Sequence, residues 1–236
     1  MNSPAFLTAA AHPLRWQMLT ELSRSDLAVH ELTGRVAQSQ NLVSYHLGKL
    51  RKAGLVTARR SSADGRDTYY ALDLARCSEL ITGMGGALHP ALRLTTPPVR
   101  RAARTRVLFV CTGNSARSPM AEALLRHRAA PDGAGSPVEV LSAGVRPKPV
   151  NPHAVAVMAA RGIDISHARP RHLDDVAGRP FDHVITLCDR AKENCTAGTA
   201  HWSMPEPREL SEFHDTAGLL DRRIAFLMHT LGEEGS

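Results

Sequence analysis

The feature that most constrains this chain is a short apolar run that leads directly into a cysteine, a glycine-containing loop and a helix. The run is Arg106–Val110, the cysteine is Cys111, and the helix is predicted to start near Pro119. An uninterrupted apolar run of this length is typical of a buried parallel strand. In a strand–loop–helix unit, the loop amides and the first helical turn converge on one point and favour an anion there. The sequence therefore predicts an α/β domain with an anion-binding loop.

Three side chains of this loop suit the chemistry of a bound oxyanion. Cys111 would share the positive environment, which favours its thiolate. Arg117 can hold two oxygens of a tetrahedral anion with its planar guanidinium group. Ser118 would cap the helix and offer its hydroxyl to the thiolate. An inert cysteine beside a surface arginine fits this context poorly. The predicted oxyanion-binding residues are Thr112, Gly113, Asn114, Ser115, Ala116, Arg117 and Ser118.

Four cysteines are present, and three of them lie in this half of the chain. They are too few and too unevenly placed for a disulfide scaffold, which leaves catalytic, redox or metal roles. A second apolar run, Phe181–Leu187, ends at Cys188, so we expect Cys188 at the same sheet edge as Cys111. Cys195 follows seven residues later. A thiol relay explains these positions better than a buried Cys188 with Cys195 as a surface thiol.

Strands and helices alternate through the rest of this half. Val138–Leu141 is predicted as a strand, Pro152–Arg161 as a helix closed by Gly162, and Thr216–Leu231 as a final helix. This alternation indicates a three-layer α/β domain with a parallel sheet and its site at the carboxyl ends of the strands. The 12 histidines show no spacing typical of metal ligands, so no metal site is predicted.

The positive charge of the chain lies entirely in its first half. Residues 1–104 hold 14 Lys and Arg against 7 Asp and Glu, whereas residues 105–236 hold 15 against 16. This asymmetry predicts a polyanionic partner for the first half alone. Residues 95–104 contain two prolines and three arginines, which is typical of an exposed linker. We therefore expect a first domain at 1–94, a linker at 95–104 and a second domain at 105–236.

The first half has the order of elements of a winged helix-turn-helix domain. Helices are predicted over Pro13–Leu22, over Val29–Val36 and from Ser39 until Gly54. A strand, an Asp-Gly turn and a second strand follow over Leu55–Leu72 and form a hairpin with a basic tip. A small helical domain with a solvated charged face explains neither this order nor the excess of positive charge.

The third of these helices is predicted to read DNA. Its inward face is expected to hold Leu42, Val43, Leu47 and Leu50. The other face carries amides and hydroxyls that suit base edges in a major groove, followed by basic residues that suit phosphates. The predicted DNA-binding residues are Gln38, Ser39, Gln40, Asn41, Ser44, Tyr45, His46, Lys49 and, at the hairpin tip, Arg66.

The stretch Leu42–Val56, read as LVSYHLGKLRKAGLV, resembles the recognition helix of ArsR-type winged-helix repressors, and His12–Arg15 resembles their first core helix. The resemblance covers about residues 5–75. It implies a homodimer bound to palindromic operator DNA, and the segment Leu74–Leu94 is a candidate dimerisation helix.

One departure from that family concerns metalloid sensing. Sensing members carry Leu-Cys-Val-Cys-Asp-Leu where this chain has Leu27–Leu32, read as LAVHEL, so that Ala28 and His30 replace both thiols. The family's soft-metal site therefore cannot form here, and His30 is expected to be a cap or surface residue. The sequence therefore does not identify the inducer.

The second half resembles the low-molecular-weight tyrosine phosphatase fold and, within it, the thioredoxin-coupled arsenate reductases. The resemblance spans about residues 105–231. The matching stretches are Val110–Glu122, read as VCTGNSARSPMAE, together with Ser142–Gly144, Asn151-Pro152, Gly162–His167, Val184–Cys188, Cys195 and His201-Trp202.

The resemblance to arsenate reductases implies a relay of three thiols. Cys111 attacks arsenate held by the loop and Arg117, Cys188 attacks Cys111 and releases arsenite, and Cys195 closes a disulfide with Cys188. A thioredoxin-like dithiol then supplies the electrons, and no bound cofactor is expected. One helix over residues 188–195 would separate the two Cα atoms by ~10 Å, whereas a disulfide needs ~4.4–6.8 Å. The segment is therefore expected to loop out on oxidation.

Two positions depart from the reductase pattern. Ala116 stands where a cysteine is common in this loop, but phosphatases and reductases both often have that cysteine, so the change does not discriminate between them. The family's acidic Asp-Pro is replaced by Glu206-Pro207. Glu206 is the candidate general acid for the leaving oxygen. The alternative for Glu206 is a surface residue of a proline-rich loop.

Two other functions stay open from the sequence. A phosphatase is the first, although this half contains no tyrosine to line a phosphotyrosine site and has Arg208-Glu209 where tyrosine phosphatases place aromatics. The second is a sensor, in which oxyanion binding, thiol oxidation or capture of arsenite by Cys111, Cys188 and Cys195 controls the DNA-binding half. The chain shows neither a signal peptide nor a membrane-spanning run, so a cytoplasmic location without membrane contact is expected.

Overall fold

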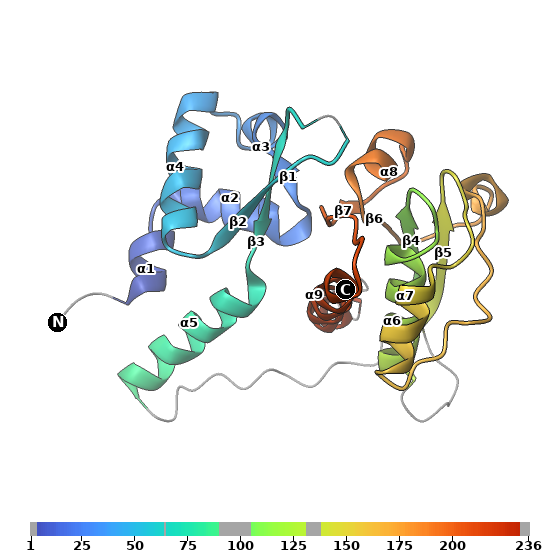
Figure 1. The fold of residues 1–236 in the computed structure, drawn as a ribbon. Coiled ribbons are helices and arrows are strands. Elements are labelled where there is room, and N and C mark those ends of the chain that lie inside the picture. The colour runs from blue at the N-terminus through green and yellow to red at the C-terminus, as the bar shows by residue number, and fades with distance from the viewer. Residues whose placement is uncertain (1–3, 64, 90–104, 131–137, 232–236) are drawn as a thin grey trace. The chain divides into compact units, whose positions relative to one another are not determined.

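The chain folds into two compact units, residues 1–98 and residues 99–236. The structure, a computed structural model, describes residues 4–63, 65–89, 105–130 and 138–231 (Figure 1). The predicted linker at 95–104 lies outside the described residues. Among the helices of the described part, none is long and apolar enough to cross a membrane.

The first unit is mainly helical and carries a small antiparallel sheet. Its strands have the order β1-β3-β2, and β2 and β3 form the predicted hairpin wing with Val56 opposite Leu72. The predicted winged helix-turn-helix is therefore confirmed. The short elements α1 and β1 were not predicted, because runs of six and two residues show no measurable periodicity. The elements are α1 (Ala5–Ala10), α2 (Pro13–Arg24), β1 (Leu27–Ala28), α3 (Val29–Val36), α4 (Gln40–Lys52), β2 (Val56–Arg60), β3 (Thr68–Leu72) and α5 (Leu74–Leu88).

The face of α4 that packs on the core differs from the predicted one at two positions. Leu42 was expected inside, yet it is 38% exposed, and His46 was expected on the DNA-facing side, yet it is 4% exposed. The buried face follows the helical spacing from Val43 through His46 to Leu47 and Leu50. Leu42 lies one position off that face, and a histidine occupies an inward position that the apolar pattern alone could not reveal.

The candidate dimerisation segment begins with α5. The Asp73 side chain caps this helix by accepting a hydrogen bond from the backbone N–H of Arg76 at 2.9 Å. Gly83, Gly85 and Gly86 lie inside the helix rather than ending it. Cys77 is the buried residue of α5, and α5 packs against α1. The rest of the predicted segment, residues 90–94, lies outside the described residues.

The second unit is an α/β domain with a four-stranded parallel sheet in the order β5-β4-β6-β7. Helix α6 packs on β4, β5 and α9, while α7 packs on α9 and α8 contacts β4 and β6 (Figure 1). The predicted parallel α/β fold is confirmed. The elements are β4 (Thr105–Cys111), α6 (Arg117–Ala129), β5 (Val138–Gly144), α7 (Pro152–Ala159), the 3-10 helix η2 (Leu173–Val176), β6 (His183–Thr186), α8 (Asp189–Asn194), β7 (Ala200–His201) and α9 (Leu210–Thr230).

The final helix begins earlier than predicted, at Leu210 instead of Thr216. The Glu212 carboxylate explains this start, because it accepts hydrogen bonds from the backbone N–H groups of Arg208 at 2.6 Å and Glu209 at 3.2 Å. These bonds satisfy donors that the first turn leaves open. They also lower the pKa of the Glu212 carboxyl group. The apolar spacing that led to the prediction starts at Leu220, nearly three turns further along the helix.

Candidate active site and nucleic-acid interface

The loop after β4 is held from outside by the segment that follows β5. The backbone N–H groups of Arg146, Lys148 and Asn151 donate to the carbonyl oxygens of loop residues 112, 113 and 115 at 2.8, 2.9 and 2.8 Å. Carbonyl oxygens bound in this way are directed away from the centre of the loop, where they would repel an anion. The positive φ of Asn114, 43°, gives the turn that the loop needs. The loop is thus built to present amides inward.

A chain of side-chain hydrogen bonds leads to the sulfur of Cys111. The Asn114 amide nitrogen donates to the hydroxyl oxygens of Ser118 at 2.9 Å and Ser142 at 2.8 Å. The Ser118 hydroxyl lies 3.0 Å from the Cys111 sulfur. Because Asn114 already donates to Ser118, the Ser118 proton is available to the sulfur. The Ser142 hydroxyl in turn donates to the Glu122 carboxylate at 2.6 Å.

Ser118 does not occupy the cap position of α6 that the sequence predicted for it. The residue at the cap position of α6 is Ala116, and Ser118 belongs to the first turn. Its hydroxyl is fully buried and is aimed at Cys111 and at the carbonyl oxygen of Ala143, 3.4 Å away, rather than at a free backbone N–H. The expectation that it caps the helix was wrong, whereas its position beside the thiol agrees with the expected donor role.

Arg117 links the anion loop to the proline-rich loop that precedes α9. It is only 5% exposed, and its Nη1 donates to the carbonyl oxygen of Met204 at 3.2 Å. Glu206 lies two residues further along that loop, with an exposed side chain. The candidate general acid is therefore in a segment anchored to Arg117, a connection that the sequence did not reveal.

The structure brings Cys188 close to the anion loop. The Thr112 hydroxyl lies 3.2 Å from the Cys188 sulfur. Burial raises the pKa of the Cys188 thiol, and the neighbouring Cys111 adds to this, whereas Arg117 and the Thr112 hydrogen bond oppose it. The two cysteines predicted to meet at one sheet edge are thus close enough for Cys111 to influence the charge of Cys188. Both are free thiols.

Cys195 lies at the far end of the short helix that Cys188 begins. Cys188 and Cys195 flank the six residues of α8. Cys195 is buried rather than a surface thiol, and burial raises its pKa against the opposing amides of Ala197 and Gly198. Among the described residues, no group of three or more His, Cys, Asp or Glu side chains is placed to hold a metal ion. Capture of arsenite by all three thiols would therefore need a rearrangement.

A buried polar cluster beside Cys188 was missed from the sequence. Asp189, His201, Ser203 and Thr186 are all buried and are joined by hydrogen bonds. The available signal was an aspartate directly after a strand-end cysteine, combined with a histidine in a later apolar stretch. Since the residues lie far apart in the chain, only the sheet pairing of β6 with β7 brings them together.

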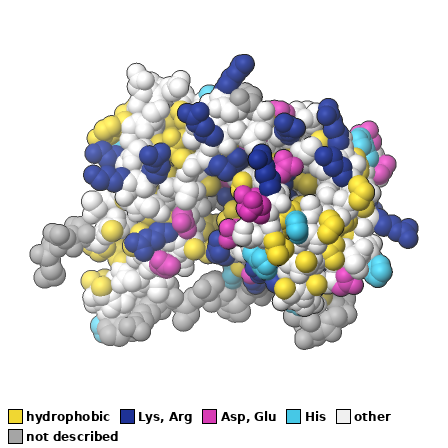
Figure 2. Space-filling view, viewed as in Figure 1, with side chains coloured by type: hydrophobic (Ala, Val, Ile, Leu, Met, Phe, Trp, Pro, Cys, Tyr) yellow, Lys and Arg dark blue, Asp and Glu magenta, His cyan; other side chains and the backbone are white. Residues whose placement is uncertain are grey.

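The predicted DNA-binding residues share the outer side of α4, with one exception. The side chains of the following residues are exposed on α4, just before it or at the hairpin tip: Gln38, Ser39, Gln40, Asn41, Ser44, Tyr45, Lys49 and Arg66. The exception is His46, whose buried ring stacks against His12 at a centroid distance of 4.4 Å. Burial, with His12 and Arg15 nearby, lowers the pKa of His46. Figure 2 shows several Lys and Arg side chains on the part of this unit that carries α4.

The fold and the two sites define the class of protein: a winged-helix regulator domain joined to a phosphatase-type α/β domain. The chain belongs to the low molecular weight phosphotyrosine protein phosphatase family, which matches residues 106–236. Residues 12–58 match the arsR family of bacterial regulatory proteins. Both resemblances seen in the sequence are thereby confirmed.

Relatives of the second unit include proteins named arsenate reductase. Arsenate reductase 1 of Staphylococcus epidermidis is 37% identical over 134 residues, which cover 52% of this chain and 95% of the relative. Among solved structures, a low molecular weight protein tyrosine phosphatase from T. tengcongensis is 30% identical with a TM-score of 0.47 and covers 53% of this chain and 99% of that chain. A thioredoxin-dependent arsenate reductase from Corynebacterium glutamicum is 27% identical with a TM-score of 0.45 and covers 66% and 71%.

Proposed function

We propose that the chain is a bifunctional protein, a DNA-binding transcriptional regulator and an arsenate reductase that uses a Cys111/Cys188/Cys195 relay. The observation that carries the proposal is the placement of Cys188 against Thr112 of the anion loop, with Cys195 buried at the other end of α8. A phosphatase needs only Cys111 and neither of the other two thiols. The relatives named arsenate reductase support the choice of substrate.

The first chemical step belongs to the anion loop. Residues Thr112–Ser118 hold arsenate through the backbone amides and Arg117. The Cys111 thiolate attacks the arsenic, an S–As bond forms, and one oxygen leaves as water. Glu206 supplies the proton for that oxygen. The Ser118 hydroxyl, 3.0 Å from the sulfur, stabilises the thiolate before the attack.

The next steps move two electrons from sulfur to arsenic. The Cys188 thiolate attacks the Cys111 sulfur, an S–S bond forms, and the electron pair of the broken S–As bond leaves with arsenic as arsenite. Cys195 then attacks Cys188 and releases Cys111 as a thiolate. The Cys188–Cys195 disulfide is reduced by a thioredoxin-like dithiol, which returns the thiols to their starting state. No bound cofactor takes part.

The second exchange requires α8 to open. A helix over residues 188–195 separates the Cα atoms of its two ends by about 10 Å, whereas a disulfide needs about 4.4–6.8 Å. Amide protection within the segment 188–197 should therefore fall when the disulfide forms. Equal hydrogen exchange in the reduced and oxidised protein would contradict the relay.

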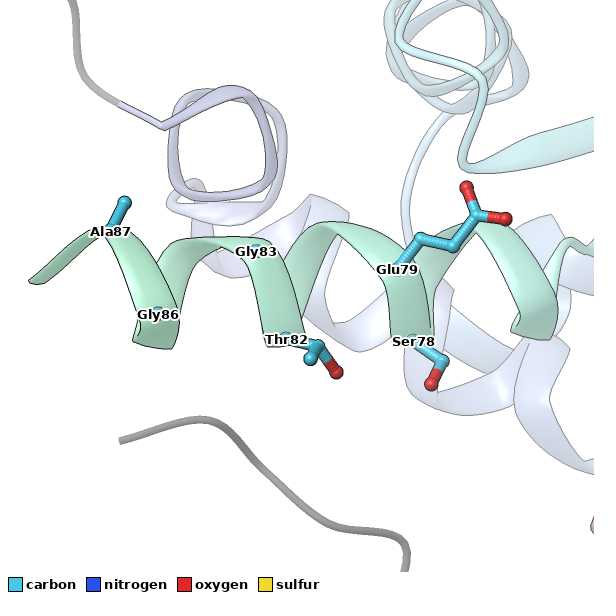
Figure 3. Close-up of a pocket in the computed structure, with 6 residues that line it drawn as sticks. All are labelled: Ser78, Glu79, Thr82, Gly83, Gly86 and Ala87. Carbon is cyan, nitrogen blue, oxygen red and sulfur yellow. The ribbon is translucent and has the colours of Figure 1, made fainter. Parts of the chain in front are cut away.

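For the first unit, we propose operator binding as a homodimer. The outer face of α4 and the tip of the wing supply the DNA contacts, with His46 in the core instead of at the bases. The second copy would pack on α5, where Ser78, Glu79, Thr82, Gly83, Gly86 and Ala87 line a shallow depression (Figure 3). The small residues of this set would allow two helices to approach closely, and a two-fold dimer suits a palindromic site.

The test is arsenate-dependent NADPH consumption with thioredoxin and its reductase, for the wild type and for the Cys111→Ser, Cys188→Ser and Cys195→Ser variants. Loss of turnover in each variant would establish the three roles. A wild type without turnover that hydrolyses p-nitrophenyl phosphate through Cys111 alone would instead be a phosphatase. Absence of both activities, with operator binding that depends on the redox state, would indicate a sensor.

A further inference from the structure

A buried carboxylate lies directly after Cys188, and the proposed relay does not use it. Asp189 is the first residue of α8 and is only 1% exposed. Its Oδ1 accepts a hydrogen bond from the Ser203 hydroxyl at 2.8 Å and lies 3.1 Å from Nε2 of His201. A charge removed from water in this way is tolerated only when it is paired, so the cluster is a built part of the fold.

The cluster connects the start of α8 to the edge of the sheet. His201 ends β7, and its Nδ1 lies 2.9 Å from the hydroxyl of Thr186, the last residue of β6. The same Nδ1 lies 3.1 Å from the backbone carbonyl oxygen of Thr186. The carboxylate is thus joined to two adjacent strands through one imidazole ring.

The remainder of α8 has fewer buried residues. Within the helix, Ala191 is the other buried residue. Glu193 and Asn194 are exposed, and so are residues 196–198 beyond Cys195, which is itself buried. Few buried contacts mean a low free energy of local opening, so α8 should open from its Cys195 end.

We propose that Asp189 is a positioning residue that keeps Cys188 beside Cys111 while the rest of α8 unwinds. The inference rests on the proposed relay. With the first residue of the helix fixed to the sheet, unwinding carries the Cys195 thiolate to Cys188 and leaves Cys188 where Cys111 can reach it. In that exchange, the Cys188–Cys195 bond forms, the Cys111–Cys188 bond breaks, and Cys111 departs with the electron pair as a thiolate.

The kinetic test compares Asp189→Asn with Glu193→Gln, a matched change from carboxylate to amide on the exposed side of the same helix. Asp189→Asn is expected to lower kcat for arsenate about tenfold or more, the size of one lost charged hydrogen bond. The KM for arsenate should stay unchanged, since the bonds from Asp189 to His201 and Ser203 involve no residue of the anion loop. Glu193→Gln should change neither constant. An unchanged kcat in Asp189→Asn, or equal losses in both variants, would overturn the proposal.

A second arm needs no arsenate, so it separates this inference from the proposed function. In a Cys111→Ser background, the diazene oxidant diamide takes two hydrogens from Cys188 and Cys195 to give the disulfide. Hydrogen exchange should then show lost protection over residues 190–197 and retained protection at Leu187 and Trp202, whose backbone N–H groups donate to the carbonyl oxygens of Val110 and Thr186. Asp189→Asn should spread the loss to those flanking residues, and Ser203→Ala, which keeps the carboxylate, should do so to a smaller extent.

Two outcomes of the second arm would refute the proposal that Asp189 fixes the start of α8 to the sheet. One is protection lost from Leu187 through to Trp202 in the oxidised protein with Asp189 intact. The other is an exchange pattern that Asp189→Asn and Ser203→Ala leave unaltered. Absence of arsenate turnover in the wild type would refute the proposed relay instead, and the exchange pattern would still decide whether Asp189 anchors the helix.

Discussion

The hydroxyl of Ser118 contacts the sulfur of Cys111. It is fully buried, receives a hydrogen bond from Asn114 and lies 3.0 Å from the sulfur. A hydrogen bond to a charged group contributes roughly 1.5–3 kcal/mol. Ser118→Ala should therefore slow the alkylation of Cys111 by iodoacetamide at neutral pH by about tenfold or more. Ser211→Ala, an exposed serine in the first turn of α9, is the control and should leave the rate unchanged.

Cys188 should respond to pH differently from an ordinary thiol. Its pKa is raised from 9.0 chiefly by burial, while the Thr112 hydroxyl opposes the shift. In Cys111→Ser, the alkylation rate of Cys188 should therefore continue to rise above pH 9.0, where an unperturbed cysteine would level off. Thr112→Val removes a donor to the thiolate and should slow the alkylation of Cys188 further at pH values below the pKa of that thiol. Mass spectrometry of the alkylated peptide measures both effects, and a rate that levels off below pH 9 would contradict a raised pKa of Cys188.

Cys111 and Arg117 were the residues most readily found from the sequence, because strand, loop and helix order is a local pattern. Asp189 and His201 could not be found in that way. Their hydrogen bond joins residues 12 positions apart, and it exists only because β6 and β7 pair. His46 shows the same limit in a helix: apolar periodicity assigns inward positions to apolar residues, whereas here a histidine occupies one and its ring contacts the ring of His12.

At the scale of elements, the end of β5 determines the shape of the anion loop. A Cβ added to Gly144 would lie 2.7 Å from the backbone nitrogen of Asn114 and 3.0 Å from the backbone carbon of Gly113. Backbone atoms in a hydrogen-bonded loop cannot move aside as a flexible side chain can. Gly144→Ala should thus displace the loop and cost about 1–3 kcal/mol in stability.

The measured consequence of Gly144→Ala should be a raised arsenate KM and a lowered melting temperature. The matched control is Gly178→Ala, because nothing lies within 4 Å of a Cβ at that glycine. If both variants bind arsenate as the wild type does, the contact between β5 and the loop does not shape the site.

Helices whose ends are marked by local sequence signals were easier to predict than helices whose ends depend on side-chain contacts. The bounds of α3 were predicted correctly, and α4 lies within its predicted range, because Ser39 at its start and the left-handed Gly54 after its end mark its limits. The start of α9 was missed, since it depends on the Glu212 side chain folding back onto Arg208 and Glu209. A carboxylate three residues into a helix is a known capping signal, but here the residue at the cap position is itself a glutamate, which propensities disfavour.

At the scale of the whole molecule, the two activities should differ in their dependence on salt. The excess of Lys and Arg lies in residues 1–104. Binding to DNA releases counterions, so operator affinity should fall steeply as salt rises. In the proposed site, arsenate would be held by a half-buried loop and by the buried Arg117, where screening by salt is weaker than at an exposed surface. Turnover should therefore change little over the same range of salt.

Lys49 and Arg66 allow this difference to be measured one charge at a time. Both side chains are exposed, Lys49 on α4 and Arg66 at the tip of the wing. Replacing either with alanine should reduce the slope of log K against log salt by about two for the proposed homodimer, because each subunit loses about one phosphate contact. Arsenate turnover should be unchanged. Arg179→Ala, in the second unit, should leave the slope intact, and if it lowers the slope as much as Lys49→Ala does, operator binding is not confined to the winged helix.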